Sequence, residues 1–334
     1  MRVDAGLRWD LESVGEQARK LEAAGFAAVQ AAETAHDPFL PLAQAALHTS
    51  AIELRTSIAV AFGRTPMALA YISNDLNIVS KGRFTLGLGS QIKPHITKRY
   101  SMPWSNPAAR MREFILALRA IWSSWHDGAR LDFRGDFYTH TLMTPFFSPG
   151  ASSFGPPRVA LAAVGPRMTE VAAEVADVLL VHAFTTETYV RETTLPALQR
   201  GWERAGKSRG DFEIAVPVFI VAADNETELE QVKAGVKQQL AFYGSTPAYR
   251  IVLESVGAGA LQPELNSLSK RGKWREMGDL FSDDLLEEFA IVAEPSQICQ
   301  RLRERFGDIA DRTALGSTGH SENMASRVLE QLRS

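Results

Sequence analysis

The chain has 334 residues and a net charge of −3, with 45% hydrophobic and 22% charged residues. These are the values of a globular protein, and a weakly acidic balance gives no reason to expect a nucleic acid as partner. Its one cysteine, Cys299, cannot form an internal disulfide, which fits a reducing cytosol. No apolar run approaches the ~20 residues of a membrane span, and the N-terminus has no apolar core of the kind that signal peptides have. We expect one soluble, cytoplasmic domain over residues 1–334 that binds neither a nucleic acid nor a membrane.

Apolar runs alternate with helical patterns over the first 90 residues. The expected strands are Val3–Leu7, Phe26–Ala32, Leu54–Phe62 and the glycine-containing stretch from Ser80 to Ser90. The expected helices between them are Asp10–Ala24, followed by Gly25 in a position that tolerates positive φ, then Pro38 to about Ser50, and Pro66–Ser80. This close alternation is typical of parallel βαβ units.

The alternation resumes after a long helix at Pro107–Trp125 and an irregular excursion at Leu131–Pro149. The expected later strands are Arg158–Val164, Val178–Phe184, Phe212–Ala222 and Thr313–Leu315, with helices at Pro166–Val175, Thr188–Ala205, Glu226–Phe242, Ser296–Phe306 and the C-terminus. Eight repeats predict an α/β fold, a closed (β/α)8 barrel, with insertions at roughly 91–156 and 243–284. An open doubly wound sheet is the alternative, disfavoured because no Gly-x-Gly-x-x-Gly follows the first strand.

The fourth expected strand carries glycines at alternate positions. Gly87 and Gly89 are interleaved with apolar residues, and Ser90 follows at the strand end. Glycine inside a strand marks the close approach of another backbone or of a ligand. Both interpretations remain open from the residues alone.

Functional residues of such barrels lie on the loops after the strands. After the second strand, Glu33 and His36 could position a cofactor edge or move protons; alternatively, Asp37 caps the next helix and Glu33 is simply solvated. After the fifth strand, the run Gly165-Pro166-Arg167 combines a helix start with a guanidinium, which is a pattern for binding an anion, although an ordinary turn with an exposed arginine gives the same pattern.

Two further segments have two interpretations each. The basic run Lys93–Arg99 could bind an anionic ligand tail, or it could be a solvated loop. The tyrosines Tyr243 and Tyr249 could line a substrate pocket, or they could anchor an insertion to the barrel. No metal-binding motif, hydrolase elbow or P-loop is present, so we predict no metal site. Redox chemistry would therefore need a bound cofactor.

An ordered set of runs resembles the bacterial luciferase-like monooxygenase superfamily, and in particular its branch that uses the deazaflavin coenzyme F420. These runs are Leu21–Phe26, Thr56–Pro66, Ser80–Gly89, Pro157–Val159, Gly165–Met168 and Ala176–Asp177, with Ala241–Arg250 pointing to the F420 branch. The resemblance implies a (β/α)8 barrel that holds the coenzyme ring at the carboxyl ends of the strands.

The resemblance also implies roles for individual residues. It places a non-prolyl cis peptide at Ser57–Ile58, a ring-edge acid at Glu33, and the coenzyme phosphate at Gly165, Pro166 and Arg167, with His182 at the neighbouring strand end. Gly89 and Ser90 would form one wall of the cofactor site. The sequence departs from the sugar-phosphate dehydrogenases of this superfamily, because Ile92 stands where they carry a catalytic glutamate.

We therefore expect an F420-dependent oxidoreductase that transfers a hydride between the deazaflavin C5 and a small organic substrate. His36 is the expected proton-handling group with Glu33 beside it, and Trp104, Tyr243 and Tyr249 are expected to form pocket walls that suit an apolar or planar molecule. The alternatives are an FMN-dependent monooxygenase that uses O2 and a separate reductase, and a non-catalytic flavin- or deazaflavin-binding barrel. Relatives suggest a homodimer or higher homo-oligomer that forms through a helix face.

Overall fold

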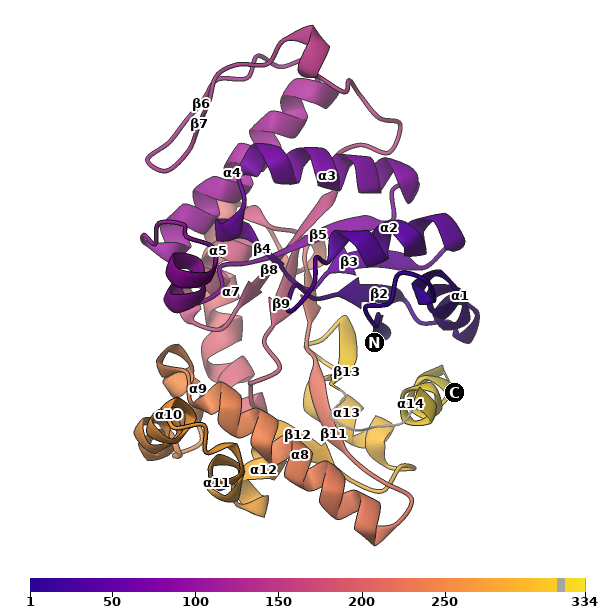
Figure 1. The fold of residues 1–334 in the computed structure, drawn as a ribbon, viewed down its shortest axis with the longest axis vertical. Coiled ribbons are helices and arrows are strands. Elements are labelled where there is room, and N and C mark those ends of the chain that lie inside the picture. The colour runs from indigo at the N-terminus through magenta and orange to yellow at the C-terminus, as the bar shows by residue number, and fades with distance from the viewer. Residues whose placement is uncertain (317–321, 334) are drawn as a thin grey trace.

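The computed structural model describes residues 1–316 and 322–333, and its parallel strands close into a barrel (Figure 1). In spatial order these strands are β1 (Arg2–Gly6), β2 (Ala28–Ala31), β3 (Glu53–Thr56) continued by β4 (Ala59–Val60), β5 (Phe84–Gly89), β8 (Arg158–Ala163), β9 (Val178–Val181), β10 (Glu213–Ala215) continued by β11 (Val218–Val221), and β13 (Arg312–Gly316). Pairing of β13 with β1 closes the ring. The predicted (β/α)8 barrel is confirmed.

Helices cover the outside of the barrel. They are α1 (Val14–Ala24), α2 (Phe39–His48), α3 (Pro66–Val79), α4 (Pro107–His126), α5 (Pro166–Val175), α6 (Glu187–Tyr189), α7 (Leu195–Ala205), α8 (Glu226–Gly244), α13 (Ile298–Phe306) and α14 (Glu322–Arg333). Four short helices occupy the second insertion, which Figure 1 shows in orange beside α8: α9 (Arg250–Glu254), α10 (Gln262–Lys270), α11 (Trp274–Asp279) and α12 (Asp283–Phe289). Gly25 ends α1 with φ of 83°, as its position predicts.

Three details differ from the expected elements. The third strand breaks after Thr56, and its last expected residues form a 3-10 turn at Ala61–Gly63. The seventh strand breaks at Pro217, which has no N–H to donate to a strand ladder. A short strand that was not expected, β12 (Ala290–Val292), pairs with β11. The first insertion contains a small hairpin made of β6 (Phe133–Arg134) and β7 (Thr139–His140).

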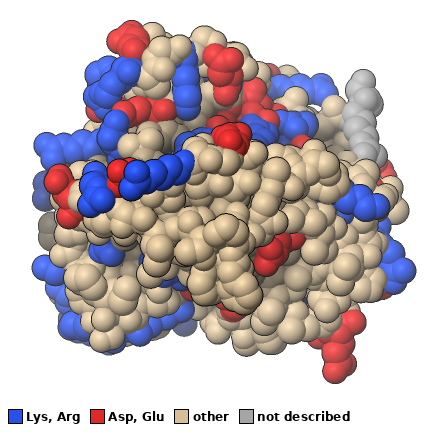
Figure 2. Space-filling model, turned by 90° about the horizontal axis from the view of Figure 1, so that it is seen from above, with Lys and Arg blue, Asp and Glu red and all other residues tan. Residues whose placement is uncertain are grey.

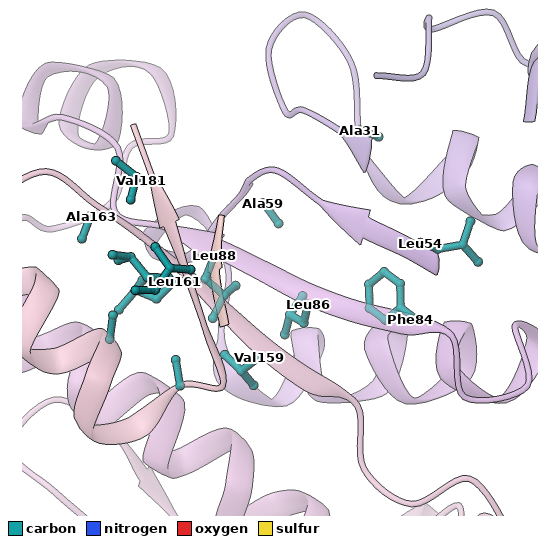
Figure 3. Close-up of a cluster of buried hydrophobic side chains, with 14 of the residues drawn as sticks. Ala31, Leu54, Ala59, Phe84, Leu86, Leu88, Val159, Leu161, Ala163 and Val181 are labelled. Atoms are coloured by element: carbon teal, nitrogen blue, oxygen red, sulfur yellow. The ribbon is translucent and has the colours of Figure 1, made fainter. Parts of the chain in front are cut away.

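The apolar core lies around β5 and its neighbours. All six residues of β5 are buried, and Figure 3 shows Phe84, Leu86 and Leu88 in the same cluster as Val159 and Leu161 of β8. A strand that is buried on both faces reads as a continuous apolar run, which is why this stretch was recognisable in the sequence. None of the helices in residues 1–316 and 322–333 is long and apolar enough to cross a membrane.

A charged network fills the barrel interior near the amino ends of the strands. The carboxylate of Asp4 on β1 pairs with Arg55 on β3 and, at 3.4 Å, with Arg312 on β13; all three side chains are at most 3% exposed. Arg312 also bonds Glu53 at 2.8 Å. Since β2 separates β1 from β3, these side chains can meet only inside the barrel. Burial raises the pKa of Asp4, and the two arginines oppose that rise.

We expect Asp4→Asn to lower the free energy of unfolding by about 3–5 kcal/mol, because it leaves two buried guanidinium groups without their shared acid. Arg2→Gln is the matched control. Arg2 bonds Glu53 at the rim of the same network, but its side chain is 44% exposed, so the loss should be about 1 kcal/mol or less. Denaturant titration of both variants measures the difference, and equal losses would contradict an energetically important buried network.

Candidate functional site

A bulge in the third strand forms the centre of the site. Between the pair Arg55–Thr85 and the pair Ala59–Leu88, the third strand advances four residues while β5 advances three, so one residue is extra. The Thr56 hydroxyl bridges the gap: it donates to the Gly87 carbonyl at 2.7 Å and accepts from the Gly87 N–H at 2.8 Å. The Ser57–Ile58 peptide bond within the bulge is cis, at the position that the resemblance indicated.

The glycines of β5 make room for this bulge. A Cβ atom on Gly87 would lie 1.8 Å from the Thr56 carbonyl oxygen, and one on Gly89 would lie 2.8 Å from Cγ1 of Ile58. The sequence left open whether these glycines admit another backbone or a ligand. The distances favour another backbone, that of the third strand packed closely against β5. Ser90 follows β5 and is half-buried, and its hydroxyl donates to the Gln91 carbonyl at 3.1 Å.

Glu33, at the end of β2, is bound to the bulge and to two other loops. Its backbone N–H donates to the Ile58 carbonyl at 3.0 Å, and its Oε2 accepts from the Val60 N–H at 2.7 Å. Arg64 donates to the same oxygen at 2.5 Å, and the Tyr100 hydroxyl donates to Oε1 at 2.6 Å. These contacts tie together the loops after β2, β4 and β5.

Both carboxylate oxygens of Glu33 are thus occupied by donors, and the side chain is only 7% exposed. Such a group is suited to holding the loops in place, and it is less suited to exchanging protons with a ligand. Asp37 completes the cluster: it accepts from Arg64 at 2.9 Å and from the Phe39 N–H at 2.8 Å. The N-cap of α2 is Pro38 and not Asp37, so Asp37 only contacts the first N–H of the helix.

His36 lies apart from the Glu33 cluster. Its ring is exposed and stacks on Trp9, with ring centroids 3.6 Å apart and planes 12° apart. Trp9 follows β1, so the stack joins the first two strand-end loops at the mouth of the barrel. The sequence analysis did not identify Trp9 as a site residue. Its position two residues after the expected strand Val3–Leu7 was the signal that could have identified it.

The start of α5 presents backbone donors. Gly165 precedes the helix, no side chain caps this end, and a Cβ atom on Gly165 would meet nothing within 4 Å. Because Pro166 has no N–H, the free donors of the first turn are those of Arg167 and Met168. The Arg167 side chain is exposed. An uncapped helix start with open space and a guanidinium beside it has the donor set that a phosphate group requires.

His182 follows β9 and is held between aromatic rings. Its centroid lies 4.8 Å from those of Tyr243 and Tyr249, which places both predicted substrate residues against it. Burial lowers the pKa of His182 to about 4, so the ring is neutral at pH 7. The Phe184 N–H donates to Nδ1 at 3.0 Å, and the neutral ring therefore carries its proton on Nε2.

A narrow crevice adjoins His182. Val164, His182 and Thr185 are among its lining residues, and it is too narrow to hold a water molecule. The Thr185 hydroxyl is buried there and has no hydrogen-bond partner within the described residues. A buried hydroxyl without a partner is unusual in a folded protein, and this one lies beside Val164, which precedes the start of α5.

The first insertion contributes residues beyond β4 and β5. Trp104 packs edge-on against Phe62, with centroids 6.0 Å apart, directly beyond β4. Lys93 and Lys98 are exposed and form no ion pair with any residue in the described ranges, whereas Arg99 donates to the Thr34 carbonyl at 2.7 Å. This hydrogen bond attaches the basic segment to the loop that holds Glu33.

The family model described as luciferase-like monooxygenase matches residues 3–312 of the chain. The chain belongs to this family. A protein of uncharacterized function from Mycobacterium tuberculosis strain H37Rv is 46% identical over 333 residues, covering 100% of this chain and 98% of its own length. A 5,10-methylenetetrahydromethanopterin reductase from Archaeoglobus fulgidus is 25% identical over 261 residues, covering 78% of this chain and 75% of its own.

The fold is also shared with a coenzyme F420 dependent tetrahydromethanopterin reductase from Methanopyrus kandleri. The two structures superpose with a TM-score of 0.82 at 18% identity, covering 100% of this chain and 98% of the other. Ile92 is the residue at which the resemblance implies a departure from the sugar-phosphate dehydrogenases. It follows Gln91, whose φ is 58°, and an aliphatic side chain there can neither give nor take a proton.

We expect the stability of this luciferase-like barrel to fall between pH 6.5 and pH 4 because of His182. The unfolded chain binds the proton near pH 6.5, whereas the folded protein binds it only near pH 4, so acidification through this window favours unfolding. The contribution is at most about 3 kcal/mol. Denaturant titrations across this pH range should show a shallower loss for His182→Gln than for the wild type; equal slopes for the two proteins would contradict the assignment.

Tyr100→Phe should lower the free energy of unfolding by about 1.5–3 kcal/mol, because it removes a hydrogen bond to a buried carboxylate. Burial and the Glu33 carboxylate raise the pKa of Tyr100 to about 12, so its hydroxyl is a donor throughout the neutral range. Tyr71→Phe, which loses an exposed hydrogen bond to the Phe147 carbonyl, is the control and should cost less. A Tyr100→Phe variant as stable as the control would show that the cluster contributes little.

Proposed function

We propose that the protein is an F420-dependent oxidoreductase whose reaction is the transfer of a hydride between the deazaflavin C5 and a small organic substrate. The observation that carries the proposal is the bulge at Thr56–Ile58, which lies at the carboxyl end of the barrel between the Glu33 cluster and the glycines of β5. A rigid, apolar surface made of Ile58 and its neighbours is suited to support a flat ring.

The residues present fit such a coenzyme. The free N–H groups at the start of α5, together with Arg167, would bind its phosphate, and Ser57, Ile58, Gly89 and Ser90 would support its ring. The orphaned Thr185 hydroxyl and the Nε2–H of His182 are neutral donors on the same side. When bound, the coenzyme supplies a two-electron hydride donor or acceptor.

The chain's own residues would bind and orient the substrate. The Trp9–His36 stack and Trp104 provide aromatic surfaces at the mouth, while Tyr243 and Tyr249 cover His182 from the second insertion. His36 is the proton-handling group in this proposal because it is exposed and Glu33 is fully hydrogen-bonded. Ile92 leaves no acid at the position used by sugar-phosphate dehydrogenases, so a sugar phosphate is disfavoured as substrate.

The basic segment favours F420 over FMN. Lys93 and Lys98 are exposed and carry charges that no acid of the described residues neutralises, and F420 has a tail of glutamates that FMN lacks. The similarity to a tetrahydromethanopterin reductase that depends on F420 is in accord with this choice. An FMN-dependent monooxygenase and a non-catalytic binder remain the alternatives that the experiment must separate.

Equilibrium titration of the purified protein with F420 and with FMN tests the proposal. We expect F420 to bind at least about tenfold more tightly, and reduced or oxidised F420 to turn over with members of a panel of carbonyl and alcohol substrates. Preference for FMN with O2-dependent turnover would replace the proposal with the monooxygenase. Tight F420 binding without oxidation or reduction by any substrate would favour the binder.

Lys93→Glu combined with Lys98→Glu should weaken F420 binding roughly tenfold at low salt, and this loss should shrink as salt is added. Binding of a deazaflavin fragment that lacks the glutamate tail should be unchanged. Lys270→Glu with Arg271→Glu reverses two exposed charges on the second insertion and is the matched control. Equal weakening for the full coenzyme and the fragment would show that the segment does not receive the tail.

A further inference from the structure

A basic turn joins two short helices of the second insertion. Residues 267–275, which include the end of α10 and the start of α11, contain four Lys or Arg residues and no Asp or Glu. Gly272 lies in the middle of the run with a φ of 68°, a conformation that glycine adopts without strain. Figure 1 shows α10 and α11 close together beside α8. The four basic residues are all exposed, and they are Lys270, Arg271, Lys273 and Arg275.

Most of this positive charge is not neutralised. Lys273 pairs with Glu276 at 2.7 Å, whereas the other three basic residues form no ion pair with any residue that the structure describes. The remaining acids of the two helices are Glu264, in the first turn of α10, and Asp279, the last residue of α11. Both lie at the helix ends away from the turn. The turn is therefore a local concentration of positive charge on a chain whose net charge is −3.

Two aromatic side chains are exposed beside the turn. Trp274, the first residue of α11, and Phe242, near the end of α8, are each 50% exposed, and their ring centroids lie 6.0 Å apart. A Cβ atom on Gly272 would lie 3.9 Å from Nε1 of Trp274, so the indole adjoins the turn. Residues 238–244 of α8 contain no charged residue. The two rings and the four basic residues together form what we call the basic-aromatic surface.

We propose that the basic-aromatic surface docks the protein on a membrane that contains anionic lipids. Lys and Arg are attracted to the negative head groups, while Trp and Phe enter the boundary between head groups and acyl chains. An indole suits this boundary because it combines an apolar body with an N–H donor. The sequence-based expectation of no membrane partner rested on the lack of a membrane-spanning run, and docking on a membrane surface needs no such run.

The exposed aromatic residues of the first insertion lack such charges. Phe146 is 89% exposed and Phe147 is 61% exposed, but residues 137–157 include no Lys or Arg. Figure 2 views the molecule from the side where Figure 1 places α3, α4 and the first insertion, and it shows a broad uncharged expanse with most charged side chains at its margin. Because anionic lipids are attracted by cations, the charge pattern favours the second insertion as the lipid contact.

A nucleic acid is the other partner that a basic run suggests. Domains that bind nucleic acids carry their Lys and Arg along a face, a stripe or a helix and have a strongly basic isoelectric point. Here the basic residues are confined to six consecutive positions, and the isoelectric point of the chain is about 6.2. A compact basic cluster beside an exposed apolar pair therefore favours a lipid surface.

A line of ring contacts connects the basic-aromatic surface to the candidate site. The centroids of Phe242 and Tyr243 lie 5.8 Å apart, and those of Tyr243 and His182 lie 4.8 Å apart. Docking through Trp274 and Phe242 would therefore hold the rings beside His182 close to the lipid, where an apolar substrate concentrates. This consequence rests on the proposed function, whereas the docking itself does not.

Cosedimentation of the full chain with lipid vesicles, in the absence of F420, tests the docking. We expect binding to vesicles of phosphatidylcholine mixed with phosphatidylglycerol, little binding to phosphatidylcholine alone, and a loss of binding as salt is added. Lys270→Glu with Arg271→Glu should weaken binding at least about tenfold, because both reversed charges would face the anionic lipid. Both positions are exposed, so far-UV circular dichroism of this variant should match that of the wild type.

Lys93→Glu with Lys98→Glu is the matched control. It reverses two exposed charges on the first insertion, so vesicle binding should be unchanged while F420 binding falls. The Lys270→Glu/Arg271→Glu variant should show the opposite pattern. Because the vesicle experiment needs no coenzyme, failure of the docking and failure of the proposed function can be told apart.

Tryptophan fluorescence tests whether the aromatic pair enters the lipid. The chain has six tryptophans, so the wild type is compared with Trp274→Phe. Anionic vesicles should shift the wild-type emission to shorter wavelength, and the shift should be smaller in Trp274→Phe. No binding to anionic vesicles, or a folded Lys270→Glu/Arg271→Glu variant that binds them as well as the wild type, would overturn the proposal. Tighter binding to single-stranded DNA than to vesicles, abolished in the same variant, would also overturn it and assign the turn to a nucleic acid.

Discussion

The fit between the bulge of the third strand and the glycines of β5 is the constraint on which the candidate site depends. The Thr56 carbonyl occupies the space that a side chain on Gly87 would need, and Ile58 does the same at Gly89. The extra residue of the bulge brings the Val60 N–H to the carboxylate of Glu33. Arg64 and Tyr100 then join the same acid, so strand packing sets the positions of three loops at the barrel mouth.

Charge is distributed differently at the two ends of the barrel. At the amino ends, Asp4 and two arginines are buried and pair with one another, although Oδ1 of Asp4 and the Nε atoms of Arg55 and Arg312 have no hydrogen-bond partner within the described residues. At the mouth, Arg64 neutralises Glu33, burial keeps His182 uncharged, and Lys93, Lys98 and Arg167 are exposed. Exposed cations at the mouth favour the approach of an anion, and the neutral imidazole can donate a hydrogen bond without adding to their charge.

Local signals in the sequence predicted the elements whose boundaries depend on local chemistry. Helix α5 spans the predicted Pro166–Val175, because proline and glycine mark its start, and Gly25 ends α1 for the same kind of reason. The contacts of Tyr100 and Trp9 were not predictable in this way. Tyr100 meets Glu33, and Trp9 meets His36, only because the barrel brings separate strand ends together, and no spacing pattern encodes either pair.

Two helices adjoin the candidate site at their first turns. Helix α2 begins at Phe39, two residues beyond Asp37, which Arg64 binds, and α3 begins at Pro66, two residues beyond Arg64. The outer faces of these helices carry exposed apolar residues, whereas their first turns adjoin the Glu33 cluster. Packing that holds these two helices in place therefore also restrains, through Arg64 and Asp37, the loop that holds Glu33 against the bulge.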